Sequence, residues 1–398
     1  MPSKPLASPM CISWHLSSAP WLAPIPTPTN CGERRSPSTD DPDSHRMKPE
    51  QVAEAVPTIA LQTWITANVA SAQGPVTVSH LSGGSSNLTF RVRDDANDWV
   101  LRRPPAGAFL ATANDMGREY RVQTGLRDTG VPVPQTIAMC EDDSVIGVPF
   151  YLMDFVDGIV YSDTDQVAQL NHAQALGATD QLIDVLARLH AVDFEAAGLG
   201  QLGKPAGFLE RQVNRWCTQW EKSKQRELPD IDEVAKRLKR SIPANTDVSI
   251  VHGDYSFNNT MWSRTDPTQM VAVLDWEMST LGDPLTDLGM VSVYWGDAGE
   301  IMWRNRSPQP HRLNPGFPAG DHLLARYEAS SGRSISNIDV YRVLAVFKLS
   351  IITEGALARI KATRPDEDTT RTENTIAELA ALALTLASNS SVTTLRGS

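Results

Sequence analysis

The chain has 398 residues, of which 41% are hydrophobic and 21% are charged, enough apolar material to bury a sizeable core. Lysine and arginine number 36 against 47 aspartates and glutamates, so the formal net charge is −11. An acidic chain is not attracted to a nucleic-acid backbone or to an anionic membrane, so we expect neither partner. The four cysteines are too dispersed for a Cys-x-x-Cys site and too few for a disulfide scaffold, which favours a cytoplasmic location.

The first 46 residues differ in composition from the rest of the chain. They contain nine prolines, many serines and threonines, and no apolar periodicity, so we predict a disordered tail. Four basic and four acidic side chains cancel within it, which leaves the whole net charge in residues 47–398. The tail lacks the basic start and the following apolar run of a secretory signal, so we do not expect one. Met47 is a second candidate for the first residue. No stretch is long and apolar enough to predict a membrane span.

Residues 47–157 show short β-branched runs separated by turns, with one helix among them. Periodicity predicts a leading helix and then the order β-β-β-α-β-β. The predicted segments are a helix at Pro57–Ala70, strands at Val76–His80, Leu88–Arg93 and Trp99–Arg102, a helix at Asp115–Thr129, and strands at Thr136–Cys140 and Phe150–Phe155. The first three strands read as a hairpin series, which predicts a small antiparallel sheet.

Residues 158–390 are mostly helical in pattern. Leu182, Leu186 and Leu189 share one face of a helix at Gln181–His190, and a buried helix is expected at Tyr341–Ile360. Two short β-branched runs, at 248–251 and 270–274, interrupt the helices. The predicted fold class is therefore α+β, with a small antiparallel-sheet lobe at 47–157 and a larger helical lobe at 158–390.

A glycine-rich turn joins the first two predicted strands. It reads Gly83-Gly84-Ser85-Ser86-Asn87 and offers several unobstructed backbone N–H groups, as a loop over a polyphosphate requires. A flexible turn is the alternative. Arg102 ends the third strand and Glu119 follows in a helix, the arrangement in which a strand cation touches phosphates while a helix carboxylate fixes its side chain. Either charge could instead be an ordinary surface residue.

The strongest motif is the segment from His252 to Asn259. It reads His-x-Asp-x4-Asn after a short apolar strand, a spacing that matches a phosphoryl-transfer catalytic loop. Asp254 would accept or orient the proton of an attacking hydroxyl, Asn259 would offer its carbonyl to Mg²⁺, and His252 would brace the loop. An Asx-rich turn is the alternative.

Asp275 ends the next apolar strand, 21 residues beyond Asp254. Hard Mg²⁺ prefers oxygen ligands, so Asp275 is a second candidate metal ligand, with a strand-end cap as the alternative. Glu277 could assist the metal, but a solvent-facing position is the favoured interpretation. We expect Asp287 to cap a helix or brace the loop, and His190 to be a structural histidine at the end of an apolar face.

Together these segments resemble the aminoglycoside/choline-kinase-like phosphotransferase family, a relative of the protein-kinase fold. The resemblance runs from about Leu81 to Arg359 and is closest to the branch that also occurs fused to acyl-CoA dehydrogenases. It rests on six blocks found in order: Leu101–Pro105, Arg118–Tyr120, Val131–Pro134, Leu152–Gly158, Ile250–Tyr255 and Leu274–Leu288.

The resemblance implies ATP bound between two lobes, with adenine against the Met153–Val156 hinge and thus beside Asp154 and Val156. It also implies Asp254 as catalytic base and Asn259 with Asp275 as Mg²⁺ ligands. Arg102 stands where the broader family has lysine, and a guanidinium is bulkier than an ammonium. The glycine between His252 and Asp254, and the absence of an Ala-Pro-Glu segment, argue against a protein substrate.

The segment Lys204–Arg240 would supply part of the substrate wall in this family. It has ten basic and six acidic residues, a local balance of +4 in a protein of −11. A basic wall favours an anionic acceptor such as a hydroxyacyl-CoA, whereas a polycationic aminoglycoside calls for carboxylates. A solvated helix with i, i+4 pairs is the alternative. We therefore expect a small-molecule kinase, with an antibiotic kinase or a non-catalytic nucleotide-binding docking protein as alternatives, and a functional link to an acyl-CoA dehydrogenase.

Overall fold

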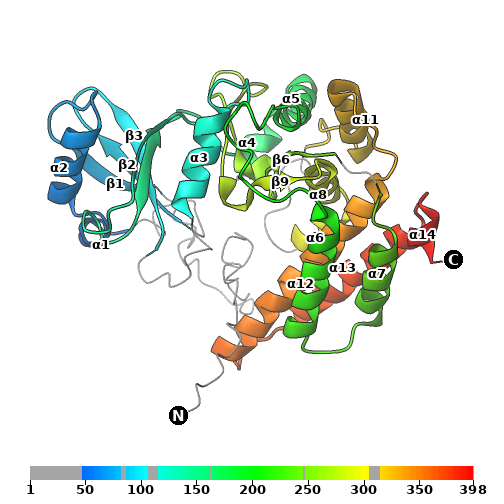
Figure 1. Cartoon of the computed structure of the whole chain (residues 1–398). Coiled ribbons are helices and arrows are strands. Elements are labelled where there is room, and N and C mark those ends of the chain that lie inside the picture. Colours follow the sequence, from blue (N-terminus) through cyan, green and yellow to red (C-terminus); the bar gives the residue numbers. More distant parts are fainter. Residues whose placement is uncertain are drawn as a thin grey trace, which may run out of the picture. The chain divides into compact units, whose positions relative to one another are not determined.

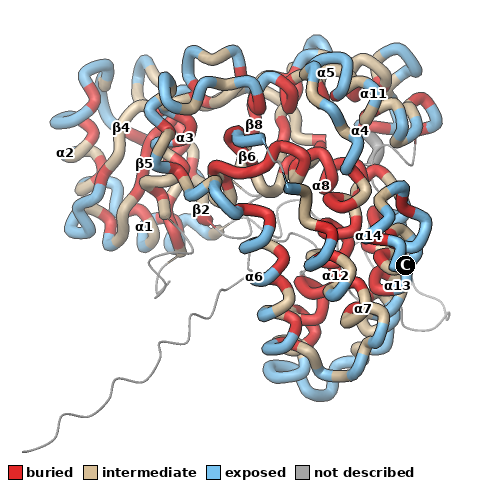
Figure 2. Tube along the Cα trace, turned by 45° about the vertical axis from the view of Figure 1, so that its right-hand side comes forward, coloured by how far each residue is buried: buried red, intermediate tan, exposed pale blue. Residues whose placement is uncertain are grey.

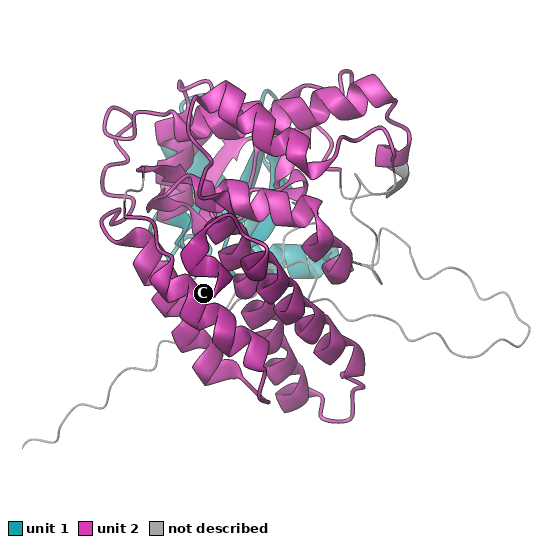
Figure 3. Cartoon of the chain, turned by 90° about the vertical axis from the view of Figure 1, so that its right-hand side faces the viewer, with its two compact units in different colours: residues 1–116, 140–150 teal, residues 117–139, 151–398 magenta. Residues whose placement is uncertain are grey.

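A computed structural model describes residues 47–81, 87–105, 115–161, 164–244, 247–303 and 314–397. The predicted tail and Gly83–Ser86 lie outside these ranges. The chain forms two compact units, one within residues 1–116 and 140–150 and the other within 117–139 and 151–398 (Figure 3). Each unit is described by itself.

The first unit is a small antiparallel sheet with two short helices. Its elements are α1 (Pro49–Ala55), α2 (Thr58–Asn68), β1 (Thr77–Leu81), β2 (Leu88–Arg93) and β3 (Asp98–Arg103). The strands form a meander in which Thr77 pairs with Arg93 and Leu88 with Arg103. The turn between β2 and β3 is closed by Asp94, whose Oδ1 accepts hydrogen bonds from the N–H groups of Ala96 and Asn97. The predicted hairpin series is confirmed.

Three elements begin or end at the boundary between the units. They are α3 (Met116–Leu126), β4 (Thr136–Cys140) and β5 (Phe150–Asp154), and β4 and β5 are neighbours in the strand order. Each corresponds to a predicted helix or strand within a few residues.

The second unit is dominated by helices. They are α4 (Thr164–Ala168), α5 (His172–His190), α6 (Phe208–Ser223), α7 (Pro229–Arg240), α8 (Leu285–Trp295), α9 (Asp297–Trp303), α11 (Gly320–Ser331), α12 (Ile338–Thr363), α13 (Thr370–Ser388) and α14 (Thr393–Arg396). Helix α12 packs against α6, α8 and α13 and is buried over much of its length (Figures 1 and 2). The buried helix predicted at 341–360 is thus confirmed and is longer at both ends, and the predicted α+β class is confirmed as well.

Two small antiparallel ladders interrupt these helices. Strand β6 (Ser249–Val251) pairs with β9 (Thr280–Gly282), and β7 (Thr260–Trp262) pairs with β8 (Met270–Val273). The single-turn helices η3 (Phe257–Asn259) and η4 (Trp276–Met278) connect them. The sequence predicted β6 and β8 but not their partners. The motif that begins at His252 lies between the two ladders, so both of its ends are held by strand pairing.

Among the helices of the described ranges, none has the length and apolar character needed to cross a membrane.

Candidate active site

The loop after β6 has a backbone shape that its sequence dictates. Gly253 adopts φ +87°, a left-handed conformation that glycine enters without steric cost. A Cβ at this position would lie 2.8 Å from the carbonyl oxygen of Met278. Glycine therefore allows the catalytic loop to approach the segment that follows Asp275.

Asp287 braces this loop from the first turn of α8. Its Oδ2 accepts the backbone N–H of His252 at 2.7 Å, and its Oδ1 accepts that of Gly253 at 2.8 Å. His190 lies 3.3 Å from the same carboxylate and 2.7 Å from the hydroxyl of Tyr327, and the three side chains are buried. These bonds lower the pKa of Asp287 despite its burial, which works in the opposite direction. The predicted roles of Asp287 as a loop brace and of His190 as a structural histidine are confirmed.

His252 ties the two halves of the site together. Its Nε2 donates to the carbonyl of Leu274 at 2.9 Å, and its Nδ1 accepts the backbone N–H of Asp254 at 3.3 Å. Burial lowers the pKa of His252, so the ring is neutral, with its proton on Nε2. The imidazole thus positions Asp254 without carrying a charge.

Hydrogen bonds join Asp254 and Asn259, the predicted base and one predicted metal ligand. Asn259 Nδ2 donates to the Oδ2 of Asp254 at 3.1 Å and to its backbone carbonyl at 2.8 Å. This leaves Asn259 Oδ1 as an oxygen ligand. Burial raises the pKa of Asp254 to about 7, with Lys348 opposing the increase and Asp275 adding to it. A carboxylate with a pKa near neutrality, partly open to solvent, has the properties of a general base.

Strand pairing brings the two predicted metal ligands to one edge. Thr260 pairs with Val273, and the N–H of Leu274 donates to the carbonyl of Asn259 at 2.9 Å. Asn259 and Asp275 therefore flank the same end of the β7–β8 ladder. Asp275 has φ 64°, the only positive φ of a non-glycine residue among the described residues. Such a conformation costs free energy and is typical of functional positions.

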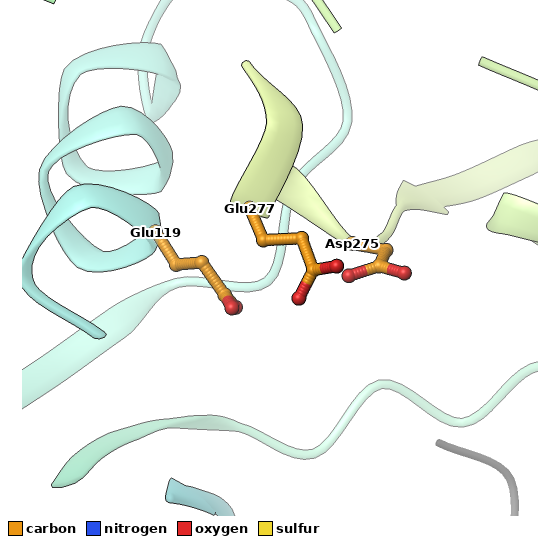
Figure 4. Close-up of side chains that lie close together, drawn as sticks. All are labelled: Glu119, Asp275 and Glu277. Atoms are coloured by element: carbon orange, nitrogen blue, oxygen red, sulfur yellow. The ribbon is translucent and has the colours of Figure 1, made fainter. Parts of the chain in front are cut away.

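Three carboxylates meet beside this edge. Glu119 of α3 points toward Asp275 and Glu277, and one oxygen of each lies within 4.8 Å of the others (Figure 4). Tyr151 fixes Glu119 by donating to its Oε2 at 2.9 Å. Glu277 is half-buried in this cluster, so the expectation that it faces solvent is wrong. Neighbouring carboxylates repel one another, and their oxygens are the ligands that Mg²⁺ prefers.

The remaining predicted residues are distributed over both units. Asn87 is buried just before β2, and Arg102 lies on β3, both in the first unit. Glu119, Asp154 and Val156 belong to the second unit. The pairing of Arg102 with Glu119 and the contacts of the nucleotide therefore stay predictions.

The site contains one residue that the sequence did not identify. Lys348 of α12 donates to the carbonyl of Gly253 at 3.3 Å, next to the candidate base. Burial lowers the pKa of Lys348, and Asp254 and Asp287 partly counteract this. The only indication in the sequence is that Lys348 is a charged residue within the apolar run 341–360, and a lysine at such a position can also have a structural role.

A braced loop carrying a carboxylate and an amide, beside a cluster of acidic oxygens, has the groups that phosphoryl transfer requires. Comparison with protein families agrees: residues 77–318 match the family described as phosphotransferase enzyme family. The chain belongs to this family, and the prediction of an enzyme is confirmed.

Curated relatives are longer proteins. The chain is 31% identical to acyl-CoA dehydrogenase family member 11 of Rattus norvegicus and 30% identical to family member 10 of Mus musculus, and each match covers 78% of this chain. These matches span only 40% and 29% of the two relatives. The predicted branch of the family is therefore confirmed.

Solved structures share the fold. A Ralstonia eutropha protein described as a candidate aminoglycoside phosphotransferase is 32% identical, with a TM-score of 0.73 over 83% of this chain and 97% of that one. The GDP complex of aminoglycoside 2'-phosphotransferase-IIIa superposes with a TM-score of 0.54 at 17% identity, over 82% and 99% of the two chains. At that identity the likeness shows the fold alone.

Proposed function

We propose that this protein transfers the γ-phosphoryl group of ATP to a hydroxyl of a small molecule, and that the acceptor is a hydroxyacyl-CoA or a related metabolite. The observation that carries the proposal is the pair formed by Asp254 and Asn259 on a loop held beside Asp275. In the reaction, the acceptor oxygen bonds to the γ-phosphorus, the bond to the β-phosphate oxygen breaks, and ADP leaves. Asp254 takes the hydroxyl proton.

The residues present fit Mg²⁺. Asn259 Oδ1 and the carboxylate of Asp275 would bind the ion, and Glu277 is close enough to Asp275 to add a third oxygen. When bound, the ion would neutralise charge on the β- and γ-phosphates. A cation among the carboxylates would also remove the repulsion within the cluster that Glu119 completes.

The nucleotide would be held mainly by residues that the sequence analysis selected. We assign the phosphates to the backbone of Gly83–Asn87 and to Arg102, and the adenine to the segment of Asp154 and Val156. The GDP complex of a protein with this fold supports a nucleotide site in general. ATP as the nucleotide, a cytoplasmic location and a functional link to an acyl-CoA dehydrogenase stay proposals, the last supported by the names of the curated relatives.

The alternative acceptor is an aminoglycoside, as the description of the Ralstonia structure suggests. Such a polycation would need carboxylates around Asp254. Asp275 and Asp287 do act on Asp254, but both have roles in the loop and the predicted metal site, whereas the cation Lys348 contacts the residue before the base and favours an anionic acceptor. A docking protein without turnover is disfavoured because the base and both metal ligands are present.

Release of ADP by the full chain tests the proposal. It should require ATP, Mg²⁺ and an acceptor from a panel of hydroxyacyl-CoAs, aminoglycosides and macrolides. Asp254→Asn should abolish it, whereas Asp366→Asn, which removes an exposed carboxylate after α12, should not. Turnover that survives Asp254→Asn would refute the assignment of the base, and turnover of aminoglycosides alone would refute the acceptor class.

A further inference from the structure

Two cationic side chains, those of Arg215 and Lys348, contact the ring of one tryptophan, and one of them also contacts the loop that carries Asp254. Trp216 of α6 is buried, at 3% exposure. The guanidinium carbon of Arg215 lies 5.5 Å from the centre of its ring, and Lys348 Nζ lies 5.8 Å from the same centre. Both distances are within the range of cation–π attraction. The ring of Trp216 therefore lies within cation–π distance of two positive charges.

One of these charges adjoins the candidate base. Lys348 Nζ also donates to the carbonyl of Gly253, the residue before Asp254. An ammonium group carries three N–H donors, and this bond, a long one, is the only hydrogen bond of Lys348 among the described residues. No described carboxylate lies within ion-pairing distance of Lys348, so most of its donor capacity is available to a ligand.

A cation is unfavourable at this position without such a ligand. Burial lowers the pKa of Lys348, Asp254 and Asp287 oppose this in part, and the positive charge of Arg215 adds a smaller decrease. Asp287 acts on Lys348 only as a neighbouring charge, because its carboxylate accepts two backbone N–H groups and contacts His190. A buried cation costs free energy unless a counter-charge or a ligand stabilises it.

Several other cations of the segment Lys204–Arg240 contact groups within the protein. Arg226 lies 3.4 Å from Glu373, and Arg237 lies 2.8 Å from Glu233 and donates to the carbonyl of Arg396. Arg211 donates to backbone carbonyls at the start of α6. These three arginines contact groups of the protein itself. Fewer cations are therefore available to a substrate than the ten basic residues of the segment indicate.

We propose that Arg215 and Lys348, held by Trp216, bind an anionic group of the phosphate acceptor and so place its hydroxyl at Asp254. The ligand chemistry is a carboxylate or a phosphate on a hydroxyl-bearing small molecule. Arg215 offers a fork of donors and Lys348 a compact charge. This inference rests on the proposed function, because it needs an acceptor hydroxyl at the base.

One hydroxyacyl chain presented in three forms tests the proposal. The free hydroxy acid carries its charge on a carboxylate, the CoA thioester carries it on phosphates, and the pantetheine thioester is neutral. With the full chain and ATP, we expect the KM of a charged form to be at least tenfold below that of the neutral form. Which charged form is favoured identifies the source of the anion.

Variants separate this subsite from other roles of the lysine. Lys348→Met and Arg215→Gln should each raise the KM of the favoured charged acceptor about tenfold and leave that of the neutral one and of ATP unchanged. Lys222→Met, which removes an exposed charge from the same helix as Arg215, should change nothing. An equal loss with all acceptors, or a loss of kcat alone, would assign Lys348 to the transferring phosphate or to the loop and overturn the proposal.

Binding measurements cover the case in which the proposed reaction fails. If no acceptor is phosphorylated, calorimetry with the free acid, with CoA and with pantetheine still tests the subsite. Binding of one anion that Lys348→Met weakens tenfold, in a variant whose thermal unfolding matches that of the wild type, would retain the subsite while the kinase activity is rejected. Binding that neither Lys348→Met nor Arg215→Gln changes, or no binding of either anion, would reject the subsite.

Discussion

Replacing the catalytic carboxylate should stabilise the protein. Burial raises the pKa of Asp254 from 3.8 to about 7, so the folded state disfavours the ionised form. At about 1.4 kcal/mol per pKa unit, the difference corresponds to roughly 4 kcal/mol above pH 7. Solvent reaches part of the Asp254 side chain, so we expect about half of this to be measured. Asn259 can still donate to the amide oxygen of Asp254→Asn.

The pH dependence of this effect has a definite sign. Between about pH 4 and pH 7 the folded state binds the proton of Asp254 and the unfolded state releases it, so the contribution of this residue to the free energy of unfolding falls as pH rises. Asp254→Asn cannot ionise and loses this dependence. The two proteins should differ most at pH 8 and least near pH 4.

Urea unfolding at several pH values, with a chelator present to remove divalent ions, measures the difference. Asp366→Asn is the matched control and should behave as the wild type at every pH. Equal stability of Asp254→Asn and the wild type at pH 8, or a lower stability of the variant there, would refute the reasoning that burial destabilises the ionised base.

Three further predictions concern the brace, the metal and the base. Asp287→Ala leaves buried N–H groups and His190 without their acceptor and should lower the free energy of unfolding by about 3–5 kcal/mol in urea titrations; a loss under 1 kcal/mol would contradict the brace. Glu277→Gln should weaken Mn²⁺ binding, measured by electron paramagnetic resonance, about tenfold, whereas the exposed Glu328→Gln should not, and equal affinities would exclude Glu277 from the metal site. Finally, kcat/KM should rise with pH up to about 7 as Asp254 loses its proton and then level off, and a rate independent of pH between 5.5 and 8 would count against this base.

The sequence predicts those parts of the site whose chemistry is local. The loop from His252 to Asn259 brings its base, its amide and its glycine together within eight residues, so spacing alone is informative. The strand Met270–Val273 shows a clear β-branched run. Its partner β7 has only three residues, too short for any period to be visible.

Parts of the site that depend on tertiary contacts cannot be read in this way. Lys348 reaches Gly253 from a helix 95 positions further along the chain, and Glu119 meets Asp275 across 156 positions. Glu277 follows Asp275 by two positions, which is compatible with a metal ligand and with a surface glutamate, and its neighbours in the sequence do not decide between the two. The basic composition of Lys204–Arg240 likewise does not show that Arg226 pairs with Glu373 or that Arg237 donates to the carbonyl of Arg396, because both partners lie far along the chain. Only the i, i+4 pair of Arg237 with Glu233 is visible in the sequence.

Mass analysis of the acceptor tests the central claim most directly. The full chain, ATP, Mg²⁺ and a hydroxyacyl-CoA should yield an acceptor that carries one added phosphoryl group and one ADP for each product molecule. Asp254→Asn should form none, and Asp366→Asn should match the wild type. An acceptor left unmodified while ATP is hydrolysed, or a product formed equally well by Asp254→Asn, would contradict the account.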